Sequence, residues 1–321
     1  MAQQHVAGGG QLARILARLE PLLGSLAGEP MPLSGGITNH NFRVTLSGVD
    51  YVVRVHGKDT DLLGIDRDAE RAASELAARL AIAPAVAMAL DDCLVTRFIP
   101  NDPVGQLEIA ESVREIARAL RSFHDCGASL PSRFWVPDLL AEYAARVRER
   151  GGALPRVYAD ADALVARIAA ALPLIQPRPC HNDLLASNII RAHGDSDDGG
   201  GGLMIVDWEY AGMGHPCFDL GNLSVNNDFD EGADERLLAA YHGATPSDGQ
   251  RAVLKLMRLL SDAREGAWGV VQEHVSDVEF DFERYAREHF ERMSATADGP
   301  RLEEWLAAAR GGGRERGGQA A

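Results

Sequence analysis

Long hydrophobic runs are missing from this sequence, and cysteines are few. No apolar stretch approaches the roughly 20 residues that a membrane-spanning helix needs, and the N-terminal sequence MAQQHVAGGG is too polar to resemble a secretory signal peptide. The 4 cysteines are scattered without paired spacing. These absences argue against a membrane protein and against a disulfide framework. We therefore expect a soluble, globular protein of the reduced cytoplasm.

Basic residues are also scarce relative to acidic ones. The chain of 321 residues contains 32 Lys and Arg against 47 Asp and Glu, which gives a formal net charge of −15. Because non-specific binding to nucleic acid depends on clustered Lys and Arg, this charge argues against a nucleic-acid partner. It is compatible with a small cationic substrate. With 46% apolar residues, the chain is long enough to bury the core of one large or two ordinary domains.

Hydrophobic periodicity divides the chain into a small β-rich part and a larger helical part. In the first part we predict a helix over residues 11–27, a hairpin over 41–47 and 51–56, a helix over 66–80 and a strand over 93–99. The second part is predicted to be helical over 106–125, 137–149 and 158–172 and again from Glu231 onward. We therefore expect an α+β fold whose two parts meet near residues 100–103.

Two more short strands are predicted late in the chain, over residues 188–191 and 203–206. They are joined by a glycine- and aspartate-rich insert over 194–202, which we interpret as a flexible loop. The glycine-rich C-terminal residues are expected to be disordered. The predicted organisation is thus an N-terminal helical extension over 1–30, a small lobe over 31–100, a larger lobe over 101–310 and a disordered tail over 311–321.

Three polar residues around these short strands form the most specific motif. The segment HNDLLASN places Asn188 five residues after Asp183, and the apolar run LMIV leads into Asp207. Either piece alone is also typical of a turn or a helix cap. Their order, however, is that of the protein kinases: a catalytic-loop Asp, then an Asn, then a metal-binding Asp after the next strand. We therefore predict Asp183 as the residue that orients or deprotonates an acceptor hydroxyl, and Asn188 and Asp207 as oxygen ligands of Mg²⁺.

A glycine-containing segment before the predicted hairpin is the candidate phosphate-binding loop. The sequence LSGGITNHN contains Gly35, Gly36, Thr38 and Asn39. Glycines allow backbone N–H groups to approach phosphates closely, and small polar side chains can cover them. A Gly-Gly pair alone is usually only a turn. Its position before the hairpin favours a role in binding ATP.

The second strand of the hairpin carries a basic residue, Arg54. Kinases hold the α and β phosphates of ATP with a basic residue at this place. Glu70, in the following helix, is the candidate ion-pair partner that would hold the basic group in position, and Glu75 is the competing candidate. The alternative is that Arg54 is an ordinary solvated residue of the strand.

Six segments resemble a known family. In the same order over residues 31–295, the chain is similar to the choline/ethanolamine kinase family in GGITN, VVRVHGK, DRDAE, RFIP, HNDLLASN and IVDWEYAGMGHPCFDLGN. This family belongs to the wider aminoglycoside-phosphotransferase and protein-kinase-like superfamily. The resemblance implies a protein-kinase-like fold with a small β-rich N-lobe that binds nucleotide and a larger, mainly helical C-lobe that binds the acceptor. It also implies ATP and Mg²⁺ as cofactors and choline or a related amino alcohol as the acceptor.

The same resemblance implies roles for further residues. The backbone of Arg97 and Ile99, at the hinge between the lobes, would contact the adenine edge, and Asp219 would anchor the catalytic loop. A quaternary ammonium group needs aromatic faces and nearby carboxylates. The residues that the resemblance assigns to acceptor binding, besides Asp183, are Glu209, Tyr210, Trp268, Phe280 and Tyr285.

One position departs from the family pattern. Eukaryotic members have a tryptophan three positions before the residue that matches Trp268, and this chain has Glu265 there. A carboxylate suits an amine that donates hydrogen bonds as well as a trimethylated one, so choline, ethanolamine and other amino alcohols stay open. The second hypothesis is an aminoglycoside- or thiamine-type phosphotransferase with the same mechanism. The third is a non-catalytic, pseudokinase-like nucleotide-binding module, which the presence of Asp183, Asn188 and Asp207 disfavours.

Overall fold

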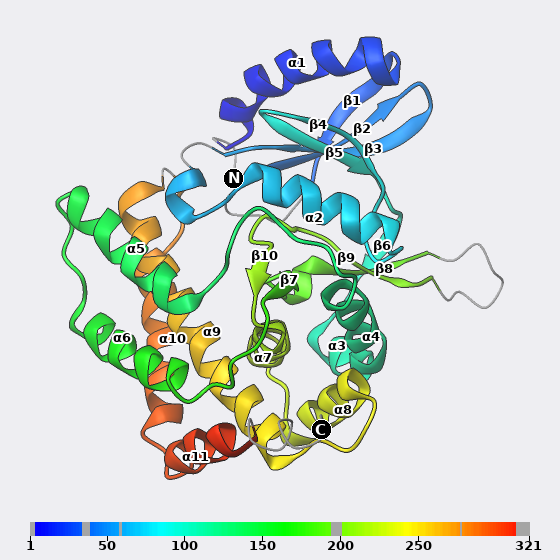
Figure 1. Ribbon diagram of the computed structural model, residues 1–321. Helices are drawn as coiled ribbons and strands as arrows, with labels where there is room; N and C mark the ends of the chain where they lie inside the picture. The colour runs from blue at the N-terminus through cyan, green and yellow to red at the C-terminus, as the bar shows by residue number, and fades with distance from the viewer. Residues whose placement is uncertain (1–3, 34–38, 58–59, 194–200, 277, 313–321) are drawn as a thin grey trace.

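The computed structural model describes residues 4–33, 39–57, 60–193, 201–276 and 278–312. Gly35, Gly36 and Thr38 of the candidate phosphate-binding loop lie outside these ranges, as do residues 194–200 of the insert. The described chain forms a smaller N-terminal lobe around one sheet and a larger, mainly helical C-terminal lobe (Figure 1). The predicted α+β fold of two lobes is therefore confirmed.

Five antiparallel strands form the N-terminal sheet, in the order β1, β2, β3, β5, β4. Their bounds are Leu26–Pro32 (β1), His40–Leu46 (β2), Val49–Val55 (β3), Val86–Leu90 (β4) and Cys93–Arg97 (β5). The predicted hairpin is β2 and β3, and the strand predicted over 93–99 is β5. Because side chains alternate along a strand, Val53 and Val55 of β3 face the buried side while Arg54 faces the opposite side.

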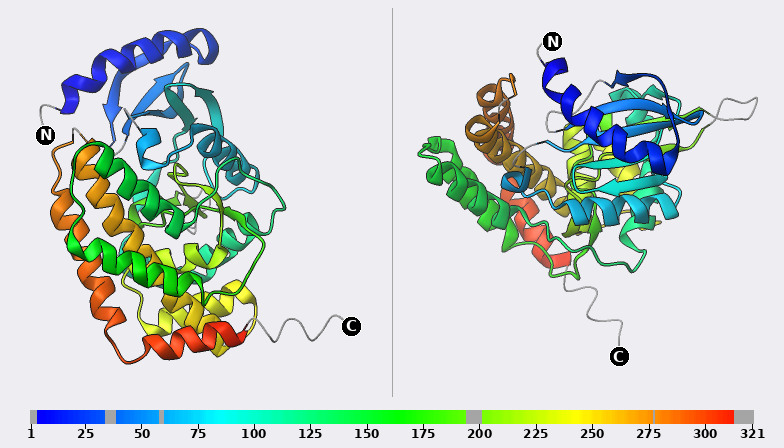
Figure 2. Two further views of the ribbon diagram at one scale, coloured as in Figure 1. Left: turned by 60° about the vertical axis from the view of Figure 1, so that its left-hand side comes forward. Right: turned by 90° about the horizontal axis from the view of Figure 1, so that it is seen from above.

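Two helices cover the two faces of this sheet (Figure 1 and Figure 2). Helix α1 (Gln4–Leu23) packs Ile15 and Leu19 against the buried side chains of the sheet, Val53 among them. Helix α2 (Arg67–Arg79) lies on the other face, and its first turn is capped by Asp66, whose carboxylate accepts the backbone N–H groups of Asp68 and Ala69. Arg54 therefore faces α2 and the C-terminal lobe.

The helix predicted over residues 11–27 ends earlier than expected, at Leu23. Gly24 follows it with φ 101°, and a Cβ at this position would lie 1.9 Å from Oγ of Ser47. The chain then turns into β1, whose Leu26 pairs with Leu46 of β2. Residues 26–30, which we assigned to the helical extension, are therefore part of the sheet.

The C-terminal lobe contains two small sheets and most of the helices. Strands β6 (Asn101–Pro103), β8 (Ile189–Ala192) and β9 (Leu203–Ile205) form one sheet, and β7 (Arg178–Cys180) pairs with β10 (Gly212–Gly214). The helices are α3 (Gln106–Glu111), α4 (Val113–His124), α5 (Val136–Glu149), α6 (Arg156–Ala169), α7 (Pro216–Asn226), α8 (Glu231–His242), α9 (Asp248–Val275), α10 (Phe282–Ala297) and α11 (Leu302–Gly312). The two short strands predicted from the sequence are β8 and β9.

Two predicted boundaries in this lobe are wrong. The helix expected over 106–125 is broken at Ser112, where φ is −88° and ψ is 6° and where the hydroxyl oxygen accepts a hydrogen bond from Arg191. Residues 311 and 312, which we expected to lie in the disordered tail, belong to α11, because this helix continues through Gly312.

Helix α9 is the central element of the C-terminal lobe. It contacts α5, α6, α7, α10 and α11, as the views in Figure 2 also show. Close approach to α7 depends on Gly221, since a Cβ there would lie 2.5 Å from Cβ of Met257 in α9. Among the helices that the structure describes, none combines the length and the apolar character needed to cross a membrane.

Candidate active site

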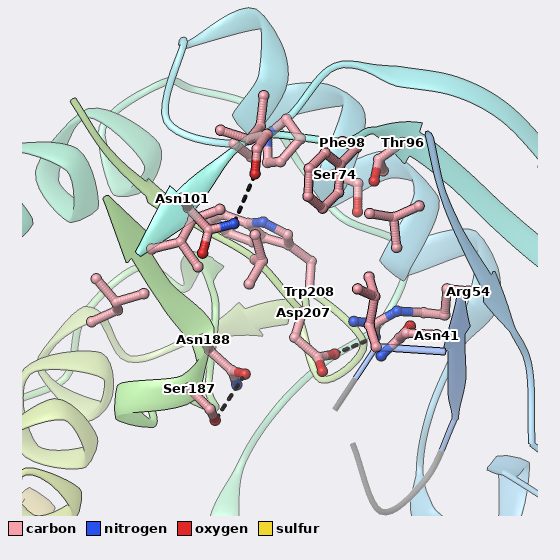
Figure 3. A pocket seen from close by; sticks show the side chains of 18 of the residues that line it. Asn41, Arg54, Ser74, Thr96, Phe98, Asn101, Ser187, Asn188, Asp207 and Trp208 are labelled. Carbon is pink, nitrogen blue, oxygen red and sulfur yellow. Dashed lines mark hydrogen bonds and ion pairs between the residues drawn. The ribbon is translucent and has the colours of Figure 1, made fainter. Parts of the chain in front are cut away.

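A cavity of about 530 Å³ lies between the two lobes (Figure 3). This volume is in the range of small-molecule sites. The sheet, α2, the segment between the lobes and the β8–β9 hairpin all contribute to its lining. The sequence-predicted residues that line it are Arg54, Glu70, Arg97, Ile99, Asn188 and Asp207.

The loop after β7, which carries Asp183, is held by one buried carboxylate, that of Asp219 in α7. The backbone N–H groups of His181 and Asn182 donate to its two oxygens at 2.8 and 2.7 Å. His124 Nε2 lies 2.9 Å from the same carboxylate. Burial raises the pKa of Asp219, but the hydrogen bond from His124 and the charges around it outweigh burial, so the pKa lies below its ordinary value. Asp219 therefore remains charged and fixes the loop that carries Asp183.

Asp183 lies at the end of this loop, against both Asn188 and an arginine of α9. The Asn188 amide donates to the backbone oxygen of Asp183 at 2.9 Å and lies 3.4 Å from its carboxylate. Nη1 of Arg264 is 3.5 Å from Oδ1 of Asp183. Burial raises the pKa of Asp183 well above its ordinary value, although the charge of Arg264 acts in the opposite direction. When ionised, a carboxylate with a raised pKa accepts a proton more readily than an ordinary aspartate does.

Asp207 forms an ion pair across the lobes with Arg54 (Figure 3). Arg54 also lies 3.6 Å from Oε1 of Glu70, so Glu70, and not Glu75, is the glutamate of α2 in contact with it. Burial raises the pKa of Asp207, but Arg54 outweighs this effect and the pKa lies below its ordinary value. Asp207 is therefore an ionised carboxylate.

Asn188 and Asp207 have the donor atoms that fit Mg²⁺. Because the amide nitrogen of Asn188 donates to Asp183, its amide oxygen is the atom left to coordinate a cation. Asp207 and Asn182 both have φ 68°, a left-handed conformation that few residues other than glycine adopt. Strained backbone of this kind is typical of functional sites.

Glu209 and Asn39 make a second contact between the lobes. The Asn39 amide donates to Oε2 of Glu209 at 2.6 Å, and its oxygen accepts from Arg67 at 3.0 Å. Arg67 in turn lies 3.5 Å from Glu209. Burial and the neighbouring Asp207 raise the pKa of Glu209 to about 7. This carboxyl group therefore titrates near neutral pH.

The aromatic residues predicted for the acceptor pocket form one cluster, in which they pack largely against one another. Trp268 Nε1 donates to the Tyr210 hydroxyl at 2.7 Å, and the Trp268 and Tyr285 rings meet edge to face with centroids 5.6 Å apart. Phe280 is 42% exposed and lies 6.0 Å from the Tyr285 ring. Phe282, which the sequence analysis did not consider, packs against both Trp268 and Phe280.

Two arginines of the site were missed in the sequence. Arg67 follows the N-cap of α2, and Arg264 lies in the middle of α9 beside Glu265, 2.7 Å from its carboxylate. The signal that points to Arg264 is a pair of adjacent charges on a stretch of helix that is otherwise buried. Charged side chains are almost never fully buried unless they are paired.

Comparison with known proteins gives the following matches. The model of the phosphotransferase enzyme family matches residues 29–256. Probable choline kinase 1 of Arabidopsis thaliana is 25% identical over 307 residues, which cover 82% of this chain and 85% of that protein. The family match spans both lobes and includes all the residues that line the interlobe cavity.

Solved structures agree with this result. A choline/ethanolamine kinase family protein from Mesorhizobium loti superposes with a TM-score of 0.77 at 29% identity and covers 93% of this chain and 99% of its own. The structure of LicA in complex with AMP has a TM-score of 0.69 at 23% identity and covers 91% and 98% of the two chains. The second likeness concerns the fold alone.

Proposed function

Because the chain belongs to the phosphotransferase enzyme family, we propose that it uses ATP and Mg²⁺ to phosphorylate the hydroxyl group of choline, ethanolamine or a related amino alcohol. The enzyme class, a phosphotransferase acting on a hydroxyl group, follows from its relatives. The observation that supports transfer from ATP with Mg²⁺ most strongly is the contact of Asp183 with Asn188 beside the cavity that Asp207 lines. The proposal includes a cytoplasmic location, where ATP is available.

The proposed nucleotide site is the interlobe cavity. The backbone of Arg97 and Ile99 would contact the adenine edge, and Arg54, held by Glu70, would bind the phosphates. Gly35, Gly36 and Thr38 would cover the phosphates together with Asn39. The AMP complex of LicA, a protein of the same fold, supports an adenine nucleotide as the ligand.

In the proposed reaction, the acceptor hydroxyl donates its proton to the Asp183 carboxylate while its oxygen forms a bond to the γ-phosphorus of ATP and the bond to the β–γ bridging oxygen breaks. The raised pKa of Asp183 suits this role. Asn188 and Asp207 would hold Mg²⁺, which supplies positive charge to the phosphate oxygens. Arg54 would exchange its present partner, Asp207, for those oxygens.

The acceptor would lie on the α9 side of Asp183, near Glu209, Tyr210, Trp268, Phe280 and Tyr285. This region combines aromatic rings with the carboxylates of Glu209 and Glu265, which is the chemistry that binds a small cation. An amino alcohol offers both a cationic group for these side chains and a hydroxyl group for Asp183. No other part of the proposal depends on which amino alcohol is bound.

Acceptor-dependent ADP release tests the proposal. The purified chain would be given ATP and Mg²⁺ with choline, ethanolamine, an aminoglycoside or thiamine, and we expect ADP release that requires an amino alcohol. Chelation of Mg²⁺ should abolish it. Turnover with an aminoglycoside or thiamine and with neither amino alcohol would contradict the proposed acceptor class while leaving the phosphotransferase assignment in place.

A further inference from the structure

Arg264 is an internal cation in the acceptor region. It lies in the middle of α9, is only 1% exposed and heads the largest fully buried side chains. Its Nη1 is 2.7 Å from Glu265 and 3.5 Å from Asp183. Its Nε and Nη2 atoms are buried and have no hydrogen-bond partner among the described residues. Unpaired donors of this kind are costly, and an acceptor oxygen next to Asp183 would satisfy them.

The guanidinium of Arg264 covers an aromatic face that a cationic substrate would otherwise use. The guanidinium carbon, Cζ, lies 4.2 Å from the centroid of the Tyr210 ring and 6.0 Å from that of the Phe134 ring. These are cation–π distances. The aromatic face beside the catalytic carboxylate is thus already occupied by a positive group of the protein itself.

The ammonium group of a bound amino alcohol has to lie in the same region as this guanidinium. In ethanolamine and choline, three bonds of about 1.5 Å separate the nitrogen from the hydroxyl oxygen, so the two atoms are at most roughly 4 Å apart. The oxygen must come within about 3 Å of Asp183 to transfer its proton. Since Arg264 lies 3.5 Å from Asp183, the two cations are neighbours.

Glu265 is the carboxylate that the two cations would share. One of its oxygens accepts from Arg264, and the other accepts from the Tyr285 hydroxyl at 2.8 Å. An ammonium group with an N–H can approach such an oxygen to about 2.8 Å and donate to it. The methyl groups of a trimethylammonium hold its nitrogen farther away and leave it without a donor.

A trimethylammonium group has no N–H, so cation–π contact with aromatic faces is the interaction available to it. Other side chains already cover these faces. Arg264 covers Tyr210, while Trp268 is packed edge to face against Phe282 and Tyr285. We propose that Arg264 sets the acceptor class, an inference that rests on the proposed amino alcohol kinase activity. The enzyme selects amino alcohols whose nitrogen carries at least one N–H and disfavours the quaternary ammonium of choline.

A graded methylation series tests this inference. Ethanolamine, N-methylethanolamine, N,N-dimethylethanolamine and choline would be compared by kcat/KM, measured as ADP release from ATP and Mg²⁺ by the full chain. We expect the largest decrease, about 10-fold or more, at the step from the dimethyl compound to choline, because that step removes the last N–H. Choline turned over as well as the dimethyl compound would overturn the inference and leave the proposed function intact.

Variants of Arg264 connect this preference to the residue. Arg264→Met exposes the Tyr210 face to the substrate. The kcat/KM for N,N-dimethylethanolamine should then exceed that for choline by no more than about 3-fold, even if both values drop. Arg264→Gln is the second substitution, and thermal unfolding reports whether either variant is folded. The matched control is Arg258→Met. It removes another arginine of α9, which pairs with Asp234 of α8, and should leave the ratio of the two kcat/KM values unchanged.

The outcomes separate the two proposals. An unchanged ratio in a folded Arg264 variant, or an equal change in Arg258→Met, would refute the role of Arg264. If neither Arg264 variant folds, the methylation series with the wild-type chain still tests whether the enzyme disfavours choline. ADP release that depends on none of the four amines would refute the proposed function, and the inference with it.

Discussion

Replacing Asp219 with alanine should destabilise the protein and lower its activity together. The carboxylate is fully buried and accepts hydrogen bonds from His181 N, Asn182 N and His124. Removing it leaves two backbone donors and an imidazole without their partner. The loss of one member of a buried, charged network costs about 3–5 kcal/mol, and we expect the free energy of unfolding to fall by this amount.

Urea unfolding monitored by fluorescence measures this loss, and kcat is measured well below the unfolding transition. A matched control is Asp248→Ala, because the Asp248 side chain is 96% exposed and, within the described part of the chain, forms an ion pair with Arg251 alone. The control should change stability by less than about 0.5 kcal/mol and leave kcat unchanged. A loss below about 1 kcal/mol in Asp219→Ala, or full activity in that variant, would refute the claim that this carboxylate holds the catalytic loop.

The pH dependence of stability gives the same test a second form. The pKa of Asp219 in the folded protein lies below its ordinary value of 3.8, so its contribution is fully present above that value and is lost as the pH falls through the folded pKa. The wild-type chain should therefore lose more stability than Asp219→Asn on acidification below about pH 4. Equal acid sensitivity of the two proteins would mean that Asp219 is not the charged anchor described above.

Three further predictions concern the nucleotide site, the acceptor site and the helix packing. Arg54→Met should raise the KM for ATP by about 10-fold or more, because it removes the cation that lies between Glu70 and Asp207; an unchanged KM would contradict this role. Since the pKa of Glu209 is about 7, kcat/KM for a cationic acceptor should rise with pH around neutrality as the carboxylate ionises, and Glu209→Gln should abolish that rise in the pH profile. Gly221→Ala should lower stability by about 1–3 kcal/mol in urea unfolding, because its Cβ would lie 2.5 Å from that of Met257; a neutral effect would show that α7 can shift away from α9.

The candidate catalytic and metal-binding residues could be grouped from the sequence because their spacing is local. Asp183 and Asn188 lie in one loop, and a single hairpin brings Asp207 to them, so no long-range contact had to be inferred. Glu70 could also have been separated from Glu75 by periodicity. It shares a buried face of α2 with Ala73 and Ala77, whereas Glu75 lies on the exposed face.

Other features depend on contacts that local patterns do not contain. Strand β1 is an edge strand with two prolines and mostly exposed side chains, so it lacks the alternation that identifies a strand. Arg264 is paired with its neighbour Glu265, but the role that we propose for it rests on its contacts with Tyr210 and Asp183, which are distant in sequence. The packing of Phe282 between Trp268 and Phe280 likewise depends on where α10 docks against α9.

Comparison of Asp183→Asn with the wild-type chain is the most direct test of Asp183 as the residue that accepts the hydroxyl proton. The substitution preserves the size of the side chain and removes its capacity to accept the hydroxyl proton. We expect acceptor-dependent ADP release to fall by roughly 10²–10⁴-fold. The affinity for ATP, measured by calorimetry, should change by less than about 3-fold, because the cavity is lined by other residues. Full turnover in the folded variant would contradict the assignment of Asp183 as the catalytic base.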